Sequence, residues 1–259
     1  MPALSLFTVA TSNRREKHSA NRRRHIEHAE PEMKQYHATK TLLLSGIGSA
    51  LLAVAVSLLP AETGAALVRE HGPVESATAF FYLLAALWLV YRSFQEQRGW
   101  NLTAAGLVVL LLLRELDFHA RFTTMGVLKS RYYLSPDVPA GEKTVVSVLM
   151  ILILVVAGRF VWRNLPLFIH GLRHRQAAPL AVAAAIGMAV ISKMLDSLSR
   201  PIRHLLEPLY HGSKTYLRVY EEVFEMTIPL FILLAISFAV TNRRQSANHA
   251  GSGTSRPPG

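Results

Sequence analysis

The chain has 259 residues, of which 51% are hydrophobic and only 17% charged, and its formal net charge is +11. A composition this apolar, gathered into several long uncharged runs, argues against a soluble domain. The absence of cysteine excludes disulfides, thiolate nucleophiles and cysteine metal sites, so any chemistry must use histidine, carboxylates or hydroxyls. We therefore predict an all-α, polytopic integral membrane protein.

The N-terminal segment, residues 1–40, is polar and of mixed charge, and it lacks an apolar run long enough for a secretory signal. We predict a disordered, basic, cytoplasmic tail. Glu16, Glu27, Glu30 and Glu32 argue against a mitochondrial transit peptide, because such peptides are poor in acidic residues.

Residues 41–240 contain the apolar runs. A bilayer core of about 30 Å needs roughly 20 helical residues per crossing. Six segments come near that length, which predicts a six-helix transmembrane domain with spans near 41–60, 75–94, 100–119, 144–162, 178–197 and 219–240. The 120–143 connection is long and mixes aromatic with basic residues, which predicts a segment in the membrane interface or over a site. The Gly/Ser/Pro-rich segment 241–259 is predicted to be a flexible tail.

The orientation follows from the positive charges that flank the spans. Most of them fall on one side, namely the N-terminal tail, Arg92, Arg98, Arg163, Arg173, Arg175, Arg243 and Arg244. The positive-inside rule then places both termini in the cytoplasm. In such a protein the basic excess points to anionic lipid head groups and not to nucleic acid.

Ionisable residues gather in the outer third of four predicted spans. In chain order they are Glu75, then Arg114, Glu115 and His119, then Lys193 and Asp196, and finally Glu221, Glu222 and Glu225. A charge in the hydrocarbon costs about 2.5 kcal/mol or more, so these side chains must face a partner or a wet cavity. We predict one shared polar site on the outer side.

Helical spacing places Glu115 with His119 on one face, and likewise Glu221 with Glu225 and Lys193 with Asp196. Carboxylates and an imidazole on facing helices are the ligands that helical bundles use for metal ions. One interpretation is a divalent metal, zinc, manganese, iron or magnesium, held by Glu75, Glu115, His119, Asp196 and Glu225. The other is a structural network in which Arg114, Arg121 and Lys193 neutralise the acids.

Cations on the outer side run against the orientation rule. The candidates for binding a phosphorylated lipid are Arg114, Arg121, Lys129, Arg131, Lys193 and Arg200. Guanidinium groups bind phosphate through paired hydrogen bonds. Plain contact with anionic head groups is the alternative, above all for Lys214 and Arg218.

Three resemblances bear on the function. Lys193, Arg200 and Pro201 match the KxxxxxxRP element of the phosphatidic-acid phosphatase family, whose PSGH and SRxxxxxHxxxD elements are absent. The stretch "ESATAFFYL" resembles the alkaline ceramidase group of CREST hydrolases, but that group's HxxxH has no counterpart in "YEEVFEMTIPL". Residues 62–240 also resemble uncharacterised bacterial polytopic membrane proteins with acid-rich helices, which implies a bacterial inner membrane.

Two functions fit these residues. The first is an enzyme acting on a lipid or lipid-linked phosphate, with Glu115, His119, Asp196 and Glu225 as catalytic or metal-binding groups. The second is an ion- or proton-coupled transporter that uses the same carboxylates. The inner halves of spans three, five and six are almost wholly apolar, which favours a one-sided site and hence the enzyme. Membrane lipids are the expected partners.

Overall fold

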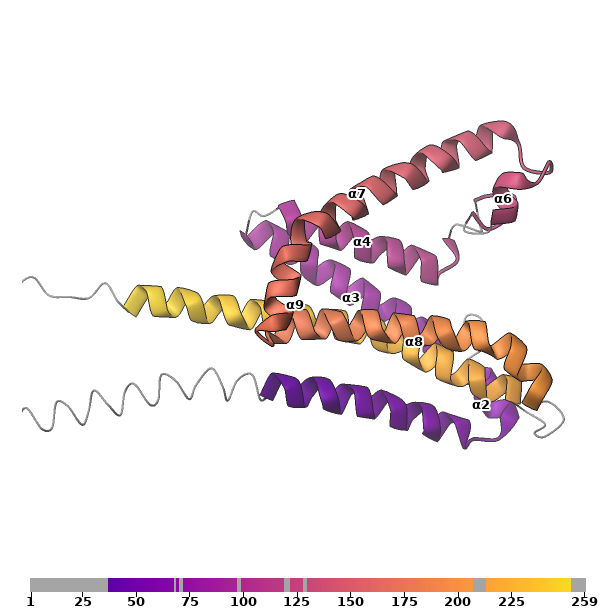
Figure 1. The fold of residues 1–259 in the computed structure, drawn as a ribbon, viewed down its shortest axis with the longest axis horizontal. Helices are drawn as coiled ribbons and strands as arrows, with labels where there is room; N and C mark the ends of the chain where they lie inside the picture. The colour runs from indigo at the N-terminus through magenta and orange to yellow at the C-terminus, as the bar shows by residue number, and fades with distance from the viewer. Residues whose placement is uncertain are drawn as a thin grey trace, which may run out of the picture.

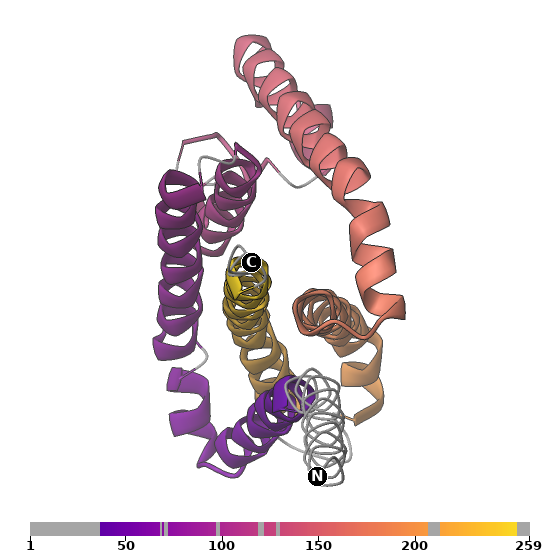
Figure 2. The same cartoon turned by 90° about the vertical axis from the view of Figure 1, so that its left-hand side faces the viewer.

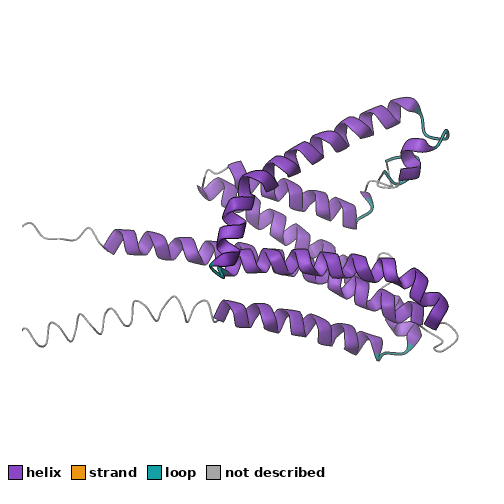
Figure 3. Ribbon diagram, in the orientation of Figure 1, coloured by secondary structure: helices purple, strands orange, loops and turns teal. Residues whose placement is uncertain are grey.

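The structure is a computed structural model. It describes residues 37–67, 69, 72–96, 99–118, 122–127, 130–206 and 213–252, without the side chains of 61, 198–206, 213–217 and 242–252. Within these ranges the chain is all-α, with no strand (Figure 3). The helices, in chain order, are His37–Ser57, α2 (Ala61–Leu67), α3 (Pro73–Glu96), α4 (Gly99–Glu115), α6 (Ser130–Leu134), α7 (Ala140–Arg173), α8 (Ala177–Leu206) and α9 (Ser213–Ser252).

Five stretches are long and apolar enough to cross a membrane, which confirms a multi-pass membrane protein. They are His37–Ser57, Pro73–Glu96, Ala140–Arg173, Ala177–Ser197 and Arg218–Thr241. Each coincides with a predicted span. The remaining predicted span, 100–119, corresponds to α4, which has 17 residues and is not among the five.

The boundaries differ from the sequence prediction at three places. The first helix begins at His37, within the segment predicted to be a tail, and residues 1–36 lie outside the described part. Helix α7 has 34 residues and runs well past 162. Helix α9 continues to Ser252, so much of the predicted flexible tail 241–259 is helical.

Helix α4 ends at Glu115, earlier than the predicted 119. The amide of Asp117 donates to the carbonyl of Arg114 at 3.1 Å, which tightens the last turn. Asp117 then takes a left-handed conformation with φ 47°, which Asp tolerates better than most residues. The predicted pairing of Glu115 with His119 on one helical face involves a residue outside the described part of the chain.

The helices run between two ends of an elongated bundle (Figure 1). The described chain begins and ends at the same end, where the start of the first helix and the C-terminal part of α9 lie. At the opposite end lie the start of α3, the end of α4 and the start of α9. We call this opposite end the acidic end.

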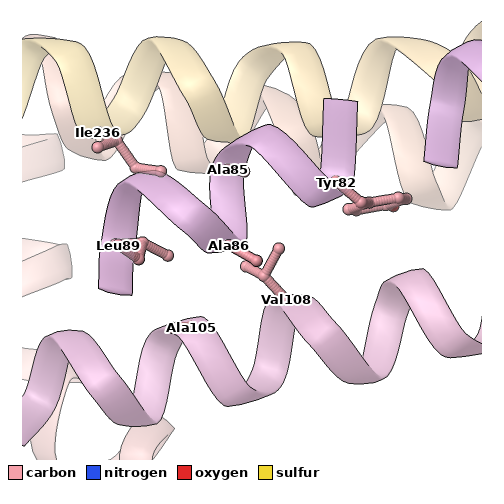
Figure 4. Close-up of a cluster of buried hydrophobic side chains, with 7 residues drawn as sticks. All are labelled: Tyr82, Ala85, Ala86, Leu89, Ala105, Val108 and Ile236. Atoms are coloured by element: carbon pink, nitrogen blue, oxygen red, sulfur yellow. The ribbon is translucent and has the colours of Figure 1, made fainter. Parts of the chain in front are cut away.

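Helices α3, α4 and α9 enclose the main hydrophobic core. Its buried residues are Tyr82, Ala85, Ala86, Leu89, Ala105, Val108 and Ile236 (Figure 4). Alanines dominate the contact, and small side chains let membrane helices approach closely. We call this set the α3–α4–α9 core.

A second cluster joins the first helix to α9. Ala53 and Val56 pack there against Val219 and Val223, which are fully buried. Helices α8 and α9 lie side by side along much of their length (Figure 1). The first turns of α9 are thereby held between the first helix and α8.

Helix α7 stands away from the other helices (Figures 1 and 2). Its large apolar side chains are exposed along its length, among them Val148, Leu152, Val155 and Trp162. In a bilayer the lipid chains solvate such a surface, so its exposure is the normal state of a membrane helix.

The turn between α7 and α8 is close-packed. Gln176 donates its amide to the carbonyl of Gly171 at 2.8 Å, and Arg175 takes a left-handed conformation with φ 52°. A β-carbon at Gly171 would lie 2.5 Å from Cγ of Pro179. Because the proline ring cannot rotate away, the turn requires glycine at this position.

We expect Gly171→Ala to destabilise the protein by about 1–3 kcal/mol, because the α7–α8 turn must open to admit the methyl group. The matched control is Gly158→Ala in the same helix, where a β-carbon meets nothing within 4 Å. There the gain in helix propensity should leave stability equal or higher by up to about 1 kcal/mol. Unfolding of both variants in detergent micelles measures the difference. Equal stabilities would contradict the close packing at Gly171.

Candidate functional site

Three helices bring carboxylates together at the acidic end. Helix α3 contributes Glu75 in its first turn, and α4 contributes Glu115 as its last residue. Helix α9 contributes Glu222 and Glu225. We call these four residues the acidic cluster, which lies beside α8. The helices converge because α3 packs against both α4 and α9, and α9 packs against α8.

Glu225 joins three of these helices through one oxygen atom. Ser192 of α8 donates a hydrogen bond from Oγ to Oε1 of Glu225 at 3.2 Å. A guanidinium nitrogen of Arg114 in α4 lies 3.9 Å from the same Oε1. Ser192 is almost fully buried, whereas the Arg114 side chain is 47% exposed. Glu225 is thus held from its buried side by a hydroxyl and from its open side by a cation.

Glu115 lies within electrostatic range of Glu225, Arg114, Glu222 and Glu75. Three of these four neighbours carry the same charge as Glu115. The Glu115 side chain is only partly exposed, so solvent screens the repulsion incompletely. The carboxylates of the acidic cluster therefore repel one another, and Arg114 and Arg218 lie beside Glu225 and Glu222 respectively.

Tyr82 closes the cluster toward the middle of the bundle. It is 3% exposed and lies within electrostatic range of Glu115, Arg114 and Glu225. Tyr82 is also part of the α3–α4–α9 core (Figure 4). The carboxylates therefore lie next to the tightly packed α3–α4–α9 core.

A second group of charges lies at the α8–α9 interface. Lys193 and Asp196 form an ion pair one turn apart on α8, as their spacing predicted. Glu221 of α9 is within electrostatic range of both. Arg218 Nε lies 3.6 Å from Oε1 of Glu222 on the next turn of α9. These cations are more exposed than the acidic cluster and form its rim.

The structure brings together part of the predicted site. Glu75, Arg114, Glu115 and Glu225 converge, whereas Asp196 is engaged by its helix neighbour Lys193. Arg131 lies in the exposed part of α6, in the loop before α7. The remaining predicted residues fall outside the described residues or side chains, namely His119, Arg121, Lys129 and Arg200.

Three residues of the site were not among the predicted ligands or catalytic groups. The sequence places Glu222 among the ionisable residues of the outer side without giving it a role, and neither Ser192 nor Tyr82 is among the predicted site residues. Tyr82 follows Glu75 by seven residues and Ser192 precedes Asp196 by four, so each shares a helix face with a predicted residue. That spacing is the signal that points to them.

Among the residues that the structure describes, no three of His, Asp and Glu form a group that could hold a metal ion. His119, the one predicted imidazole ligand, is not described.

Comparison with known proteins gives no further guide, since no family model, curated protein or solved structure matches the chain.

We expect Ser192→Ala to lower stability by about 0.5–1.5 kcal/mol, because it deletes the buried hydrogen bond to Glu225. Ser197→Ala is the matched control on α8, since the exposed Ser197 hydroxyl donates only to the carbonyl of Lys193 in its own helix. Thermal unfolding in micelles compares the two variants. A Ser192→Ala protein as stable as the control would mean that this hydrogen bond contributes nothing to the packing of α8 on α9.

Proposed function

We propose that this chain is a six-span integral membrane protein with both termini in the cytoplasm. We further propose that its acidic cluster, together with a divalent cation, acts on a lipid or lipid-linked phosphate in the outer leaflet. The observation that carries this proposal is the convergence of carboxylates from α3, α4 and α9 around Arg114 and Ser192 at one end of the bundle. Hydrolysis or head-group transfer is the reaction type that such groups serve.

The six-span topology is supported by α4. Its 17 residues extend for about 25 Å, close to the thickness of the hydrocarbon core. It packs antiparallel along α3, so Glu115 returns to the level of Glu75. An even number of spans agrees with a described chain that begins and ends at the same end of the bundle (Figure 1). The positive-inside rule then assigns that end to the cytoplasm.

The proposed cation would act on the repulsion among the carboxylates of the acidic cluster. Around Glu115 stand three carboxylates and one guanidinium group. A surplus of negative charge in a partly buried site is costly unless protons or a metal ion compensate it. A divalent ion shared by Glu115 and Glu225 would offset this charge and would also attract a phosphate that the bare carboxylates repel. Zinc, manganese, iron and magnesium all accept carboxylate oxygen.

Two exposed cations, Lys193 and Arg114, suit the head group of such a substrate. The Lys193 side chain is 68% exposed and that of Arg114 is 47% exposed, so both reach the aqueous face of the cluster. A guanidinium group pairs well with phosphate oxygens. A lipid phosphate entering from the outer leaflet would meet these cations before it reached the carboxylates.

The apolar packing of the α3–α4–α9 core favours an enzyme over a transporter. Next to the acidic cluster, beginning at Tyr82, the α3–α4–α9 core packs apolar side chains between three helices (Figure 4). A carrier must open a polar path to both sides of the membrane. A site closed on the cytoplasmic side needs access only from the outer leaflet, which is sufficient for a reaction on lipid.

The function is tested by phosphate release from phosphatidic acid in mixed micelles, with Mg²⁺, Mn²⁺ and Zn²⁺ supplied in turn. We expect Glu115→Gln and Glu225→Gln to lower a metal-dependent rate by about 100-fold or more, because each removes a group that binds the ion or moves a proton. Glu62→Gln, an exposed change in α2, is the control and should keep the full rate. Proton-driven solute uptake by sealed vesicles that depends on Glu115, without hydrolysis, would contradict the enzyme and support the transporter.

The topology is tested separately with single cysteines, because the chain contains none of its own. Gly99→Cys, at the start of α4, meets open space, and Phe118→Cys lies just beyond its end. If α4 crosses the membrane, a membrane-impermeant maleimide added outside intact cells labels position 118 and not 99. Labelling of both positions from the same side would contradict the six-span topology.

A further inference from the structure

The connection between α4 and α7 folds as a small unit on the first turns of α7. Residues 122–127 and 130–139, which we call the outer loop unit, include the short helix α6. The unit has its own core, in which Val127, Tyr132 and Val138 are buried and Met125 and Val146 pack against them. A segment with a core of this kind holds a fixed shape.

Glu142, in the first turn of α7, fastens the outer loop unit to that helix. Its carboxylate accepts hydrogen bonds from the Thr124 amide at 2.9 Å, the Thr124 hydroxyl at 2.8 Å and the Tyr132 hydroxyl at 3.1 Å. Burial, followed by the bond to Glu142, raises the pKa of Tyr132, so the phenol remains a donor. Lys143 adds a hydrogen bond to the carbonyl of Ser135 at 2.7 Å.

The same unit carries large apolar side chains on its outside. Leu134 is 83% exposed and Phe122 is 71% exposed, while the ring of Phe118 packs on that of Phe122 at 4.6 Å between centroids. Tyr133 is also exposed beside them. Tyr132 thus points inward to Glu142 while its neighbours Tyr133 and Leu134 point outward. Apolar side chains this exposed are costly in water and mark a surface that contacts something apolar.

The position of the outer loop unit in the chain indicates that its exposed apolar side chains contact lipid. Its C-terminal end continues into α7, an apolar helix long enough to cross a membrane, and its N-terminal end follows α4. The unit therefore stays at the membrane surface, where phenylalanine, leucine and tyrosine side chains enter the boundary between head groups and acyl chains. Arg131, exposed on α6, can remain at the level of the phosphates.

We propose that the outer loop unit is a fixed interfacial anchor that inserts Phe122 and Leu134 into the outer leaflet. The hydrogen bonds to Glu142 hold the unit on α7, in contrast to a lid that must swing over the acidic cluster. The inference does not rest on the enzymatic function, since it depends only on the contacts of this loop.

Spin labels at single cysteines test the anchor in the full-length protein, reconstituted in phosphatidylcholine nanodiscs. Phe122→Cys and Leu134→Cys replace exposed side chains, so folding should be unaffected. Pro136→Cys is the control, because it is exposed in the same unit beside the charged Asp137. We expect oxygen, which concentrates in lipid, to relax the labels at 122 and 134 several-fold more than a water-soluble nickel chelate does. The label at 136 should show the reverse.

Two outcomes would overturn the proposal. If the nickel chelate reaches positions 122 and 134 as readily as 136, these side chains lie in water. If neither reagent reaches them, protein covers them, either a second copy of the chain or the bundle itself.

A second measurement tests the fastening by Glu142. Glu142→Ala combined with Leu134→Cys should sharpen the nitroxide spectrum, because three hydrogen bonds that restrain the loop are lost. An unchanged spectrum would refute the role of Glu142 in fixing the unit.

Discussion

The position of the Glu225 carboxylate constrains the whole acidic end of the molecule. One of its oxygens accepts a hydrogen bond from Ser192 of α8 and faces Arg114 of α4. A charge in a membrane is tolerated only where other groups compensate it, so these contacts restrict how α9 can rotate or slide against its neighbours. The same register brings Glu222 toward Glu75 and Glu115. The acidic cluster is a consequence of how these helices are fixed.

Apolar packing holds the helices together in the α3–α4–α9 core, and polar contacts hold them together at the acidic end. Membrane helices gain little from the hydrophobic effect among themselves, so close contact and a few polar pairs must hold them together. Ala85, Ala86 and Ala105 allow the close contact in the α3–α4–α9 core, and Glu225 supplies the polar link above it. Tyr82 belongs to both regions and separates them.

Much of this arrangement could be predicted from the sequence, because its signals are physical and local. The apolar runs predict six spans, of which five are helices long and apolar enough to cross a membrane, and residue depth predicts that Glu75, Glu115 and Glu225 lie together. The end of α4 could not be predicted in the same way. The apolar pattern continues through Leu116 and Phe118, and only the left-handed backbone at Asp117 shows where the helix ends. Likewise, depth alone could not show that Glu225 reaches across to α8, whereas helical spacing predicts the pairing of Lys193 with Asp196.

Helix α7 is longer than the hydrocarbon core of the membrane is thick. Its 34 residues extend for about 50 Å, against a hydrocarbon core of about 30 Å, and Pro166 lies inside it where a helix bends readily. The helix changes direction along its length (Figure 1). Since it has few contacts to restrain it, its tilt is free to follow the thickness of the bilayer, whereas the interlocked α3, α4 and α9 are not. A thinner or thicker membrane would therefore reorient α7, and the loop fastened to its first turn, around a core of unchanged shape.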